Sequence, residues 1–220
     1  MKENLYTYVM LSLLFFAACN SNTQKSTPEQ DAELAQVKEE QFDLRNDSLI
    51  FSSATIENFD PQGRSIDVYW LDEDRDTILF FYRKYDDNQQ LIGAEYYEEG
   101  DTSATIDTVF TNEEGLQVEA SLNAEGQISW ASTIKTDDKG NETLRTYKNG
   151  RGEYRGFDSL ALDDQNRVIR GFYENANGKR YRIKTYEYLK SDSYNNWIER
   201  NLFVNDTLSQ RHVRTLTYHQ

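Results

Sequence analysis

Apolar and polar residues alternate with a period of two from Leu44 onward. Residues 116–122 (LQVEASL) alternate without a break, so their four apolar side chains face one way and their three polar side chains the other. Residues 181–189 (YRIKTYEYL) run for nine positions without a turn-forming residue. Stretches of this kind are typical of half-buried β-strands. In the segment after Gly126, the alternation puts Ile128, Trp130 and Ile134 on one face, which predicts that Trp130 is buried.

Turn-forming residues separate these stretches at regular intervals. Four of the turns have Asn or Asp three residues before a Gly, which suits a type I turn closed by a residue with positive φ. The regular spacing predicts one strand between successive turns and an up-and-down antiparallel meander. The turns lie at residues 86–88, 98–100, 112–115, 123–126, 137–140, 148–150, 163–166, 175–178, 193–196 and 204–206.

The segment before the first strand has helical signals instead. Thr27 suits a helix N-cap, Pro28 suits the first helical position, and Gln30 completes a capping-box pattern. Good helix formers follow, so the sequence predicts one short helix over residues 28–42.

Composition narrows the expected fold further. Only 37% of the residues are hydrophobic, whereas 15 Tyr, 11 Phe and 3 Trp are present with two Pro. Aromatic residues without proline suit strands, and this apolar content can cover one face of a sheet rather than two. Open twisted sheets rarely exceed about ten strands. We therefore expect residues 28–220 to form a single all-β domain, a long antiparallel meander that is a strongly curved sheet or a partly closed barrel, with the short N-terminal helix.

The N-terminal segment carries the only cysteine, Cys19, directly behind the apolar run Val9–Ala18. Ten helical residues span about 15 Å, which is half of a hydrocarbon core, so the run is too short to cross a membrane as a helix. Its length is that of a signal-peptide core. The polar residues 20–27 (NSNTQKST) that follow are suited to a tether. An ordinary secretory signal and a buried segment of a cytoplasmic protein remain as alternatives.

Residues 16–19 (FAAC) resemble the bacterial lipobox, although Phe16 stands where Leu or another aliphatic residue is usual. This resemblance implies a signal peptide at 1–18, cleavage before Cys19, and attachment of lipid (palmitate among its chains) to Cys19. Residues 19–27 would then be the lipidated cysteine and its tether. The implied location is the cell envelope of a diderm bacterium, as an outer-membrane lipoprotein anchored in the membrane on the periplasmic face or the cell surface.

A second resemblance covers roughly residues 80–220. Residues 192–200 (DSYNNWIER) resemble the turn of YD/RHS-type repeats in bacterial surface proteins, with Asn195 where the family has Gly. Asn tolerates the left-handed conformation that such a turn needs. The resemblance implies a β-meander outside the cytoplasm and brings no catalytic residues with it. Similar meanders occur in MORN-like antitoxin or immunity proteins.

Charge is distributed unevenly along the chain. The net charge is −14, and residues 1–140 hold 10 basic and 28 acidic side chains, whereas residues 141–220 hold 14 and 10. Nucleic-acid binding requires a basic face, so we expect no nucleic-acid partner. The C-terminal third could face an anionic partner, but the preferred interpretation is that the acidic turns keep the protein soluble.

Motifs of catalysis or metal binding are missing from the sequence. Residues 72–76 (DEDRD) have alternating carboxylates, but Thr77 and Arg83 occupy the positions where an EF-hand needs Gly and Glu, so a hairpin turn is expected there. His212 and His219 are seven residues apart, which is unsuited to joint metal binding on one strand. Residues 156–160 (GFDSL) lack the G-x-S-x-G elbow of serine hydrolases. We predict that the protein is not an enzyme and that it has no cofactor.

Aromatic residues are the best candidates for a ligand surface. Trp70, Trp130 and Trp197 could stack on a sugar or a peptide, and the adjacent pair Tyr96 and Tyr97 places one ring on each face of a strand. Cross-strand aromatic pairs also stabilise sheets without any ligand. The leading hypothesis is a lipid-anchored binding or scaffolding module with a protein or glycan ligand. An immunity or antitoxin-like protein and a carbohydrate-binding protein are the alternatives.

Overall fold

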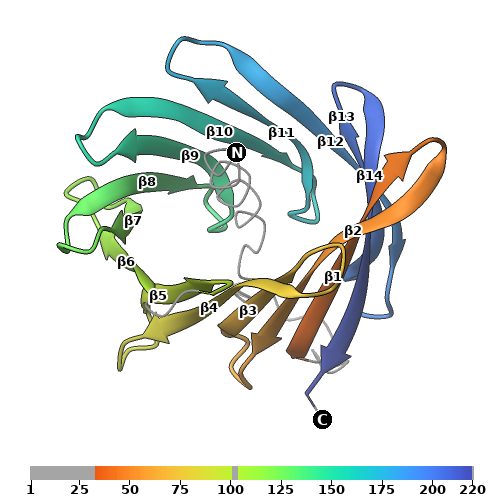
Figure 1. Cartoon of the computed structure of the whole chain (residues 1–220), viewed down its shortest axis with the longest axis horizontal. Coiled ribbons are helices and arrows are strands. Elements are labelled where there is room, and N and C mark those ends of the chain that lie inside the picture. Colours follow the sequence, from red (N-terminus) through yellow and green to blue (C-terminus); the bar gives the residue numbers. More distant parts are fainter. Residues whose placement is uncertain (1–32, 101–103, 220) are drawn as a thin grey trace.

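The computed structural model describes residues 33–100 and 104–219. They form fourteen antiparallel strands in which each strand pairs with the next along the chain, and β14 pairs with β1 to close a barrel (Figure 1). The expected all-β meander is confirmed, and the closure is complete. No helix among the described residues is long and apolar enough to cross a membrane.

The first seven strands vary from six to twelve residues in length. They are β1 (Leu34–Arg45), β2 (Ser48–Phe59), β3 (Ser65–Leu71), β4 (Thr77–Tyr85), β5 (Leu91–Glu98), β6 (Thr105–Thr111) and β7 (Gln117–Leu122). The remaining strands are β8 (Ile128–Thr136), β9 (Glu142–Asn149), β10 (Tyr154–Leu162), β11 (Val168–Asn175), β12 (Arg180–Ser191), β13 (Trp197–Val204) and β14 (Thr207–Tyr218).

The helix expected over residues 28–42 is not present where the structure describes that segment. Residues 34–42 belong to β1, which pairs with β2 on one side and with β14 on the other, while residues 28–32 lie outside the described part. Val37 and Glu39 alternate with more exposed neighbours in this strand, which is a period-two pattern. Pairing on two edges therefore outweighs the local helical propensity of these residues.

Ten of the hairpin loops have the same five-residue geometry. The first residue is Asp or Asn, its Oδ1 accepts hydrogen bonds from two backbone N–H groups of the loop, and the fourth residue has positive φ. The loop of Asp72 is an example: Oδ1 accepts from the N–H of Asp74 at 2.9 Å and of Asp76 at 3.0 Å. The expected hairpin turn at residues 72–76 is thus confirmed. The fourth positions are Gly63, Arg75, Gln89, Gly115, Gly126, Gly140, Gly152, Asn166, Gly178 and Asn195.

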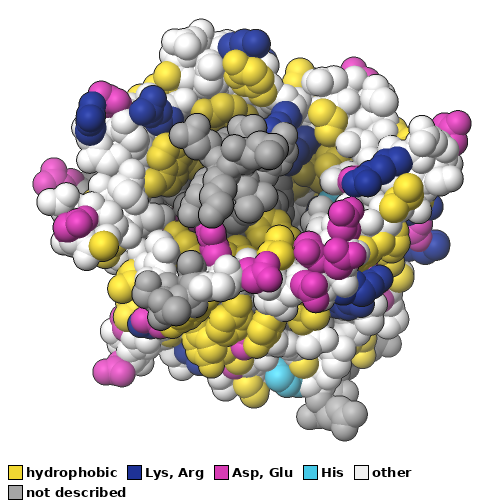
Figure 2. Space-filling view, in the orientation of Figure 1, with side chains coloured by type: hydrophobic (Ala, Val, Ile, Leu, Met, Phe, Trp, Pro, Cys, Tyr) yellow, Lys and Arg dark blue, Asp and Glu magenta, His cyan; other side chains and the backbone are white. Residues whose placement is uncertain are grey.

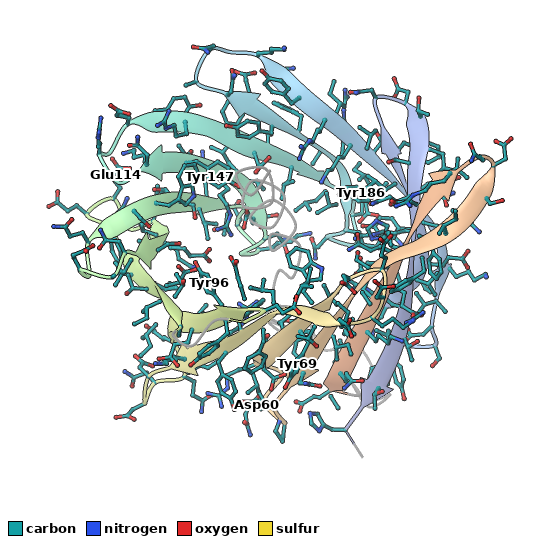
Figure 3. The ribbon with its side chains drawn as sticks, viewed as in Figure 1. Asp60, Tyr69, Tyr96, Glu114, Tyr147 and Tyr186 are labelled. Carbon is teal, nitrogen blue, oxygen red and sulfur yellow. The ribbon has the colours of Figure 1, made fainter. Side chains whose placement is uncertain are left out.

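Cross-strand register assigns each side chain to the inner or the outer face of the barrel. Tyr96, Tyr147 and Tyr186 point inward (Figure 3), and the residues paired with them follow the same face around the wall. The outer face mixes aromatic residues with ion pairs. Tyr69 stacks on Phe80 there with ring centroids 4.8 Å apart.

The adjacent residues Tyr96 and Tyr97 confirm the expected division between faces. Tyr96 points inward, and its hydroxyl donates to Asp107 Oδ1 at 3.2 Å. Tyr97 points outward and lies 6.3 Å from Phe80, centroid to centroid. The alternation over residues 116–122 is also confirmed, with the polar residues on the inner face, because Ser121 pairs directly opposite Asp107. The apolar face of this strand is the outer one.

A register shift changes the environment expected for Trp130. Ser121 pairs with Trp130, but the next residue, Leu122, pairs with Ile128, so β8 gains one residue at this point. Ile128 therefore follows Leu122 onto the outer face, where it is 41% exposed, while Ile134 stays on the inner face and is buried. Trp130 is only half-buried. The prediction that Trp130 is buried on a face shared with Ile128 was wrong because sequence alternation does not show bulges.

Candidate functional site

Two regions of the inner face differ in how their side chains pack, and β5 to β7 lie between them on one side of the barrel. Strands β13, β14 and β1 to β4 form the packed wall, whose inward side chains are buried against one another. These buried residues include Val37, Val68, Leu79, Phe81, Trp197 and Leu202. Strands β8 to β12 form the aromatic wall, where tyrosines, a tryptophan and polar groups line the interior and several rings stay half-exposed.

The packed wall contains a buried group of charged residues, which we call the closure cluster: Glu39, Arg200, His212 and Arg214. Arg200 Nη2 donates to Glu39 Oε1 at 3.1 Å, and Arg214 Nε donates to Glu39 Oε2 at 2.8 Å. His212 Nδ1 lies 2.7 Å from the same Oε1. Both guanidinium groups also lie over the Trp197 ring, at 4.1 and 3.6 Å from its centroid. The cluster joins β1, β13 and β14 at the place where the barrel closes.

Electrostatics inside the closure cluster favour an ionised Glu39. Burial acts to raise the pKa of this carboxyl, but the charges of Arg214 and Arg200 and the hydrogen bond with His212 outweigh burial and hold the pKa well below its usual range. Burial also lowers the pKa of His212, although Glu39 opposes that effect. One anion thus lies between two cations, with an imidazole that burial keeps neutral, so the four side chains together carry one net positive charge.

In a second buried carboxylate of the packed wall, Glu57 on β2, burial outweighs the nearby positive charge. It is 1% exposed, and its closest cation is Arg83, with Nη2 at 3.7 Å from Oε1. Burial raises the pKa of Glu57, and the charge of Arg83 with the Ser65 hydroxyl offsets this effect only in part. Glu57 therefore resists ionisation, whereas Glu39 favours it.

Four rings of the aromatic wall form a row along the inner surface, which we call the aromatic row: Trp130, Tyr147, Tyr173 and Tyr181. Successive ring centroids are 5.7, 6.2 and 6.4 Å apart. The rings come from β8, β9, β11 and β12, so the row crosses β10 without a side chain from that strand. They lie toward the end of the barrel where Ile128, Asn149, Asn175 and Arg180 begin or end these strands.

Gly156 on β10 makes the aromatic row continuous. Its φ is +147°, and a Cβ at this position would lie 2.6 Å from Tyr173 Oη and 2.8 Å from Tyr173 Cε2. It would also lie 2.3 Å from the backbone carbonyl oxygen of Glu174, which is the shortest of the three distances. All three are shorter than contacts that a real Cβ makes, so any other residue would displace the backbone of β11 as well as the ring. The Tyr173 hydroxyl then donates to the carbonyl of Arg155 at 2.9 Å, which fixes the ring over the glycine.

Polar groups next to the aromatic row hold its rings in place. The Tyr147 hydroxyl donates to Asp158 Oδ2 at 2.5 Å. Burial raises the pKa of Tyr147 above its usual value, and the nearby charge of Asp158 raises it further. Burial likewise raises the pKa of Asp158 and lowers that of Lys184, two groups that attract one another across the wall. Tyr147 is therefore held as a protonated donor, and the arrangement suits stacking and hydrogen bonding.

Arg145 fixes the middle of the same wall. It is 7% exposed and donates to Glu142 from Nε at 3.0 Å and from Nη2 at 2.8 Å. Its Nη1 donates to Glu119 Oε2 at 2.5 Å and to the Ser132 hydroxyl at 3.0 Å. Burial acts to lower the pKa of Arg145, but Glu142 and Glu119 outweigh it and raise the pKa. This network links β7, β8 and β9 on the same inner face as the aromatic row.

The candidate residues of the sequence divide among different regions. Trp130 belongs to the aromatic row, Trp197 belongs to the packed wall, and Trp70 is half-buried on β3. His212 is buried in the closure cluster, and His219 lies just past the end of β14, where its N–H donates to the carbonyl of Glu33. Cys19 lies outside the described residues. Within the described part, no group of three or more His, Cys, Asp or Glu residues could hold a metal ion.

Sequence reasoning missed the closure cluster and most of the aromatic row. Glu39 lies within the segment expected to be helical, and its partners are 161 to 175 residues away along the chain. Tyr181 belongs to a stretch that was correctly expected to be a strand, but its neighbour Tyr173 could not be inferred without the register. The available signal was Gly156, a glycine inside a strand pattern, which often marks a close approach.

No protein-family model matches this chain, and no curated protein sequence matches it. Among solved structures, a porin-like protein from Bacteroides uniformis ATCC 8492 is 9% identical with a TM-score of 0.32, covering 84% of this chain and 96% of that one. A DUF1329 family protein from Desulfovibrio piger ATCC 29098 is 11% identical with a TM-score of 0.35, covering 84% and 86%. Structural overlap at this level does not establish a shared function.

Proposed function

We propose that this protein is a lipid-anchored cell-envelope protein whose barrel is a binding module, with the ligand held on the aromatic wall. The aromatic row is the observation that carries the binding role. Fourteen strands make a barrel that is wider than the eight-strand barrels whose side chains just fill the interior. Tyr181 is 37% exposed, and Trp130 and Tyr173 are half-buried, so ring surface remains available to a ligand.

The anchored location is supported by the sequence and by the outer wall. Cys19 is the last residue of a lipobox-like motif, and a polar stretch separates it from the barrel, whose first strand begins at Leu34. Ion pairs lie on the outer face, among them Lys84 with Glu95 and Arg211 with Glu199. A charged side chain on a lipid-facing barrel wall costs about 2–4 kcal/mol at mid-membrane, so these pairs favour a wall in water.

The anchoring is tested with the full-length chain in a bacterial host that processes lipoproteins. The wild-type protein should incorporate an alkyne-labelled fatty acid and fractionate with membranes, and Cys19→Ser should lose the label and leave the membrane or accumulate as precursor. A Cys19→Ser protein that stays membrane-bound in processed form would refute the anchor and leave the barrel's binding role intact.

A carbohydrate is the ligand class that the aromatic row favours. Stacked rings with adjacent hydrogen-bonding groups present the apolar surface and the few polar contacts that ligand sites combine. Asp158 and Lys184 supply polar groups next to the row. The hydrogen bonds of Arg145 to two glutamates keep this part of the wall rigid. Tyr147 keeps its hydroxyl directed to Asp158, which rigidifies the row before a ligand arrives.

The binding role is tested by screening the purified full chain against a bacterial glycan array and measuring affinity by tryptophan fluorescence. Tyr181→Ala should weaken the binding of a glycan hit about tenfold, as expected for the loss of one stacking ring. Tyr82→Ala is the matched control, because Tyr82 is 46% exposed and lies on the outer face of β4. An equal loss in both variants, or no glycan hit at all, would contradict the proposal.

A further inference from the structure

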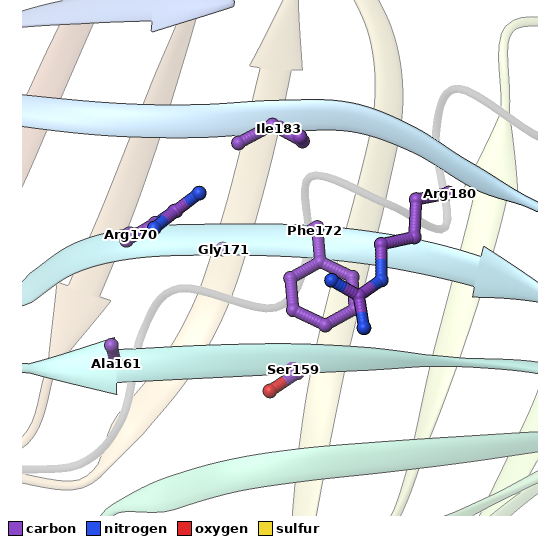
Figure 4. A pocket seen from close by; sticks show the side chains of 7 residues that line it. All are labelled: Ser159, Ala161, Arg170, Gly171, Phe172, Arg180 and Ile183. Carbon is purple, nitrogen blue, oxygen red and sulfur yellow. The ribbon is translucent and has the colours of Figure 1, made fainter. Parts of the chain in front are cut away.

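A pocket of about 170 Å³ lies on the outer face of the barrel, on the other side of the sheet from the aromatic row. Strands β10, β11 and β12 line it (Figure 4). Its lining residues are Ser159, Ala161, Arg170, Gly171, Phe172, Arg180 and Ile183. None of them belongs to the aromatic row or to the closure cluster.

A break in the strand register opens this pocket. Gly171 pairs with Lys184, but Tyr173 pairs with Tyr181, so β12 has one more residue than β11 over this stretch. Arg182 lies in the bulge and has φ of +50°. The small residues of β10 on this face, Ser159 and Ala161, leave the space beside the bulge unfilled.

Phe172 forms the central surface of the pocket, and an arginine lies on each side of it (Figure 4). The Arg180 guanidinium lies over the Phe172 ring at 4.4 Å from the centroid, and its Nε donates to Glu174 Oε2 at 2.9 Å. Stacking and the hydrogen bond hold Arg180 in place and leave its terminal nitrogens available. Glu174 compensates one of the two positive charges.

Arg170 supplies the second positive charge, and none of the described residues compensates it. It makes no ion pair, side-chain hydrogen bond or ring contact with the residues that the structure describes, and it is exposed. A guanidinium with all five donors available beside an apolar surface is suited to a planar carboxylate or a phosphate. The surrounding residues 141–220 carry an excess of basic side chains, which attracts anions to this side of the barrel.

We propose that this pocket binds a phosphate or carboxylate group that carries a small apolar or planar substituent. The oxyanion would lie between Arg170, the free nitrogens of Arg180 and the Ser159 hydroxyl, and the substituent would contact Phe172 and Ile183. The volume is below the 300–1,000 Å³ usual for drug-sized ligands, so only one such group fits at a time. The group could be a free metabolite or the exposed end of a larger molecule such as a phospholipid headgroup.

Titration calorimetry on the purified full-length chain tests the pocket with three probes: phenyl phosphate, benzoate and the neutral analogue benzyl alcohol. The two anions should bind and benzyl alcohol should not. Arg170→Gln should weaken the binding of both anions about tenfold, which corresponds to the loss of a charge-assisted hydrogen-bond pair. Since Arg170 is exposed and has no described partner, this variant should fold normally.

Arg151→Gln is the matched control, because Arg151 is an exposed arginine in the loop after β9, outside the pocket. It should change the affinity less than twofold. Failure of both anions to bind at about 10 mM would overturn the proposal, because even a 1 mM site should be largely occupied there. Equal losses in the Arg170 and Arg151 variants would also overturn it, since they would indicate binding to net charge alone.

A second arm distinguishes the source of the anion. Vesicles of phosphatidylglycerol and phosphatidylcholine are offered to Cys19→Ser protein, with phenyl phosphate as competitor. Vesicle binding that needs Arg170 and is displaced by phenyl phosphate would identify a lipid headgroup, and binding of the soluble anions alone would identify a free small molecule. These results are independent of the glycan measurements, because the pocket and the aromatic row lie on opposite faces.

Discussion

The packed wall and the aromatic wall follow the same rule of alternation, yet they use their inward polar residues differently. In the packed wall, Glu39 meets Arg200 and Arg214 in a largely buried cluster that joins the first strand to the last two. In the aromatic wall, Tyr147 and Asp158 support rings that remain partly exposed. The difference shows that inward polar groups in this barrel serve closure on one side and a binding surface on the other.

The largest expected effect comes from breaking the closure cluster. Glu39→Ala leaves two buried guanidinium groups without their anion, so we expect a loss of about 3–5 kcal/mol in the free energy of unfolding, measured by urea denaturation. Glu40→Ala on the same strand removes an anion that is partly exposed with Lys38 and Arg75, and should cost about 1 kcal/mol or less. Equal effects of the two variants would mean that the cluster does not hold the barrel closed.

A smaller effect is expected in the aromatic wall. Tyr147→Phe removes the hydrogen bond to a buried Asp158 and should cost about 1–3 kcal/mol by the same measurement. Tyr173→Phe is the control, since its hydroxyl bonds an exposed carbonyl and should contribute about 1 kcal/mol at most. A larger loss for the control would show that the row depends more on the hydrogen bond to the Arg155 carbonyl than on the one to Asp158.

The two buried glutamates of the packed wall should respond to substitution with opposite signs. The pKa of Glu57 is raised on folding, so its carboxyl favours the folded state at low pH and loses that contribution as the pH rises through the folded pKa. Glu57→Gln should therefore be more stable than wild type at pH 8, and the gain should disappear as the pH falls to about 4.

Glu39→Gln should show the reverse dependence. The pKa of Glu39 is lowered on folding, so its contribution is present above the pKa of the unfolded chain and is lost as the pH falls through the folded pKa. The variant should be less stable than wild type at pH 8, and the deficit should shrink in acid. Denaturation midpoints at pH 8, 6 and 4 test Glu57→Gln, and a further point at about pH 3 is needed for Glu39→Gln, because its deficit shrinks only below the pKa of an unfolded glutamate, about 4.3. Parallel curves would contradict the assignment of the two carboxylates.

The smallest effect concerns the loops, which are alike around both walls. Gln89 has φ of +65° at a position where six of the ten equivalent loops have Gly. Gln89→Gly should stabilise the protein by about 1 kcal/mol at most, because relief of the strained φ exceeds the added flexibility of the unfolded chain. Gly140→Ala in the corresponding loop of the aromatic wall should destabilise by a similar amount in thermal melts. A destabilised Gln89→Gly protein would show that its loop is not equivalent.

Local sequence signals accounted for the strands and the turns but not for closure. The alternation over residues 116–122 and the recurrent Asx–Gly turns identify antiparallel hairpins because they depend on neighbours a few residues apart. Pairing of β1 with β14 depends on residues at opposite ends of the chain, so residues 34–42 were expected to be helical and are a strand.

The candidate sites were less visible than the fold for the same reason. Alternation divides a strand into two faces, but it does not say which face points into the barrel. In β7 the polar face points inward, as the pairing of Ser121 with Asp107 shows. Bulges move residues between faces, as they do for Ile128 and around Arg182. The aromatic row and the outer pocket both lie next to such register shifts, where alternation in the sequence does not predict which face a side chain is on.

The shared loop geometry has a consequence for the size of the barrel. The Asx side chain at the start of each of these loops accepts hydrogen bonds from the backbone of the same loop. The five loop residues therefore determine the turn without contacts to distant strands. Insertion or deletion of one hairpin would change the circumference by two strands and leave the other turns intact. Because barrel diameter grows with strand number, the number of hairpins determines the width of the lumen. Only the closing seam, with its buried glutamate and two arginines, would have to be kept unchanged.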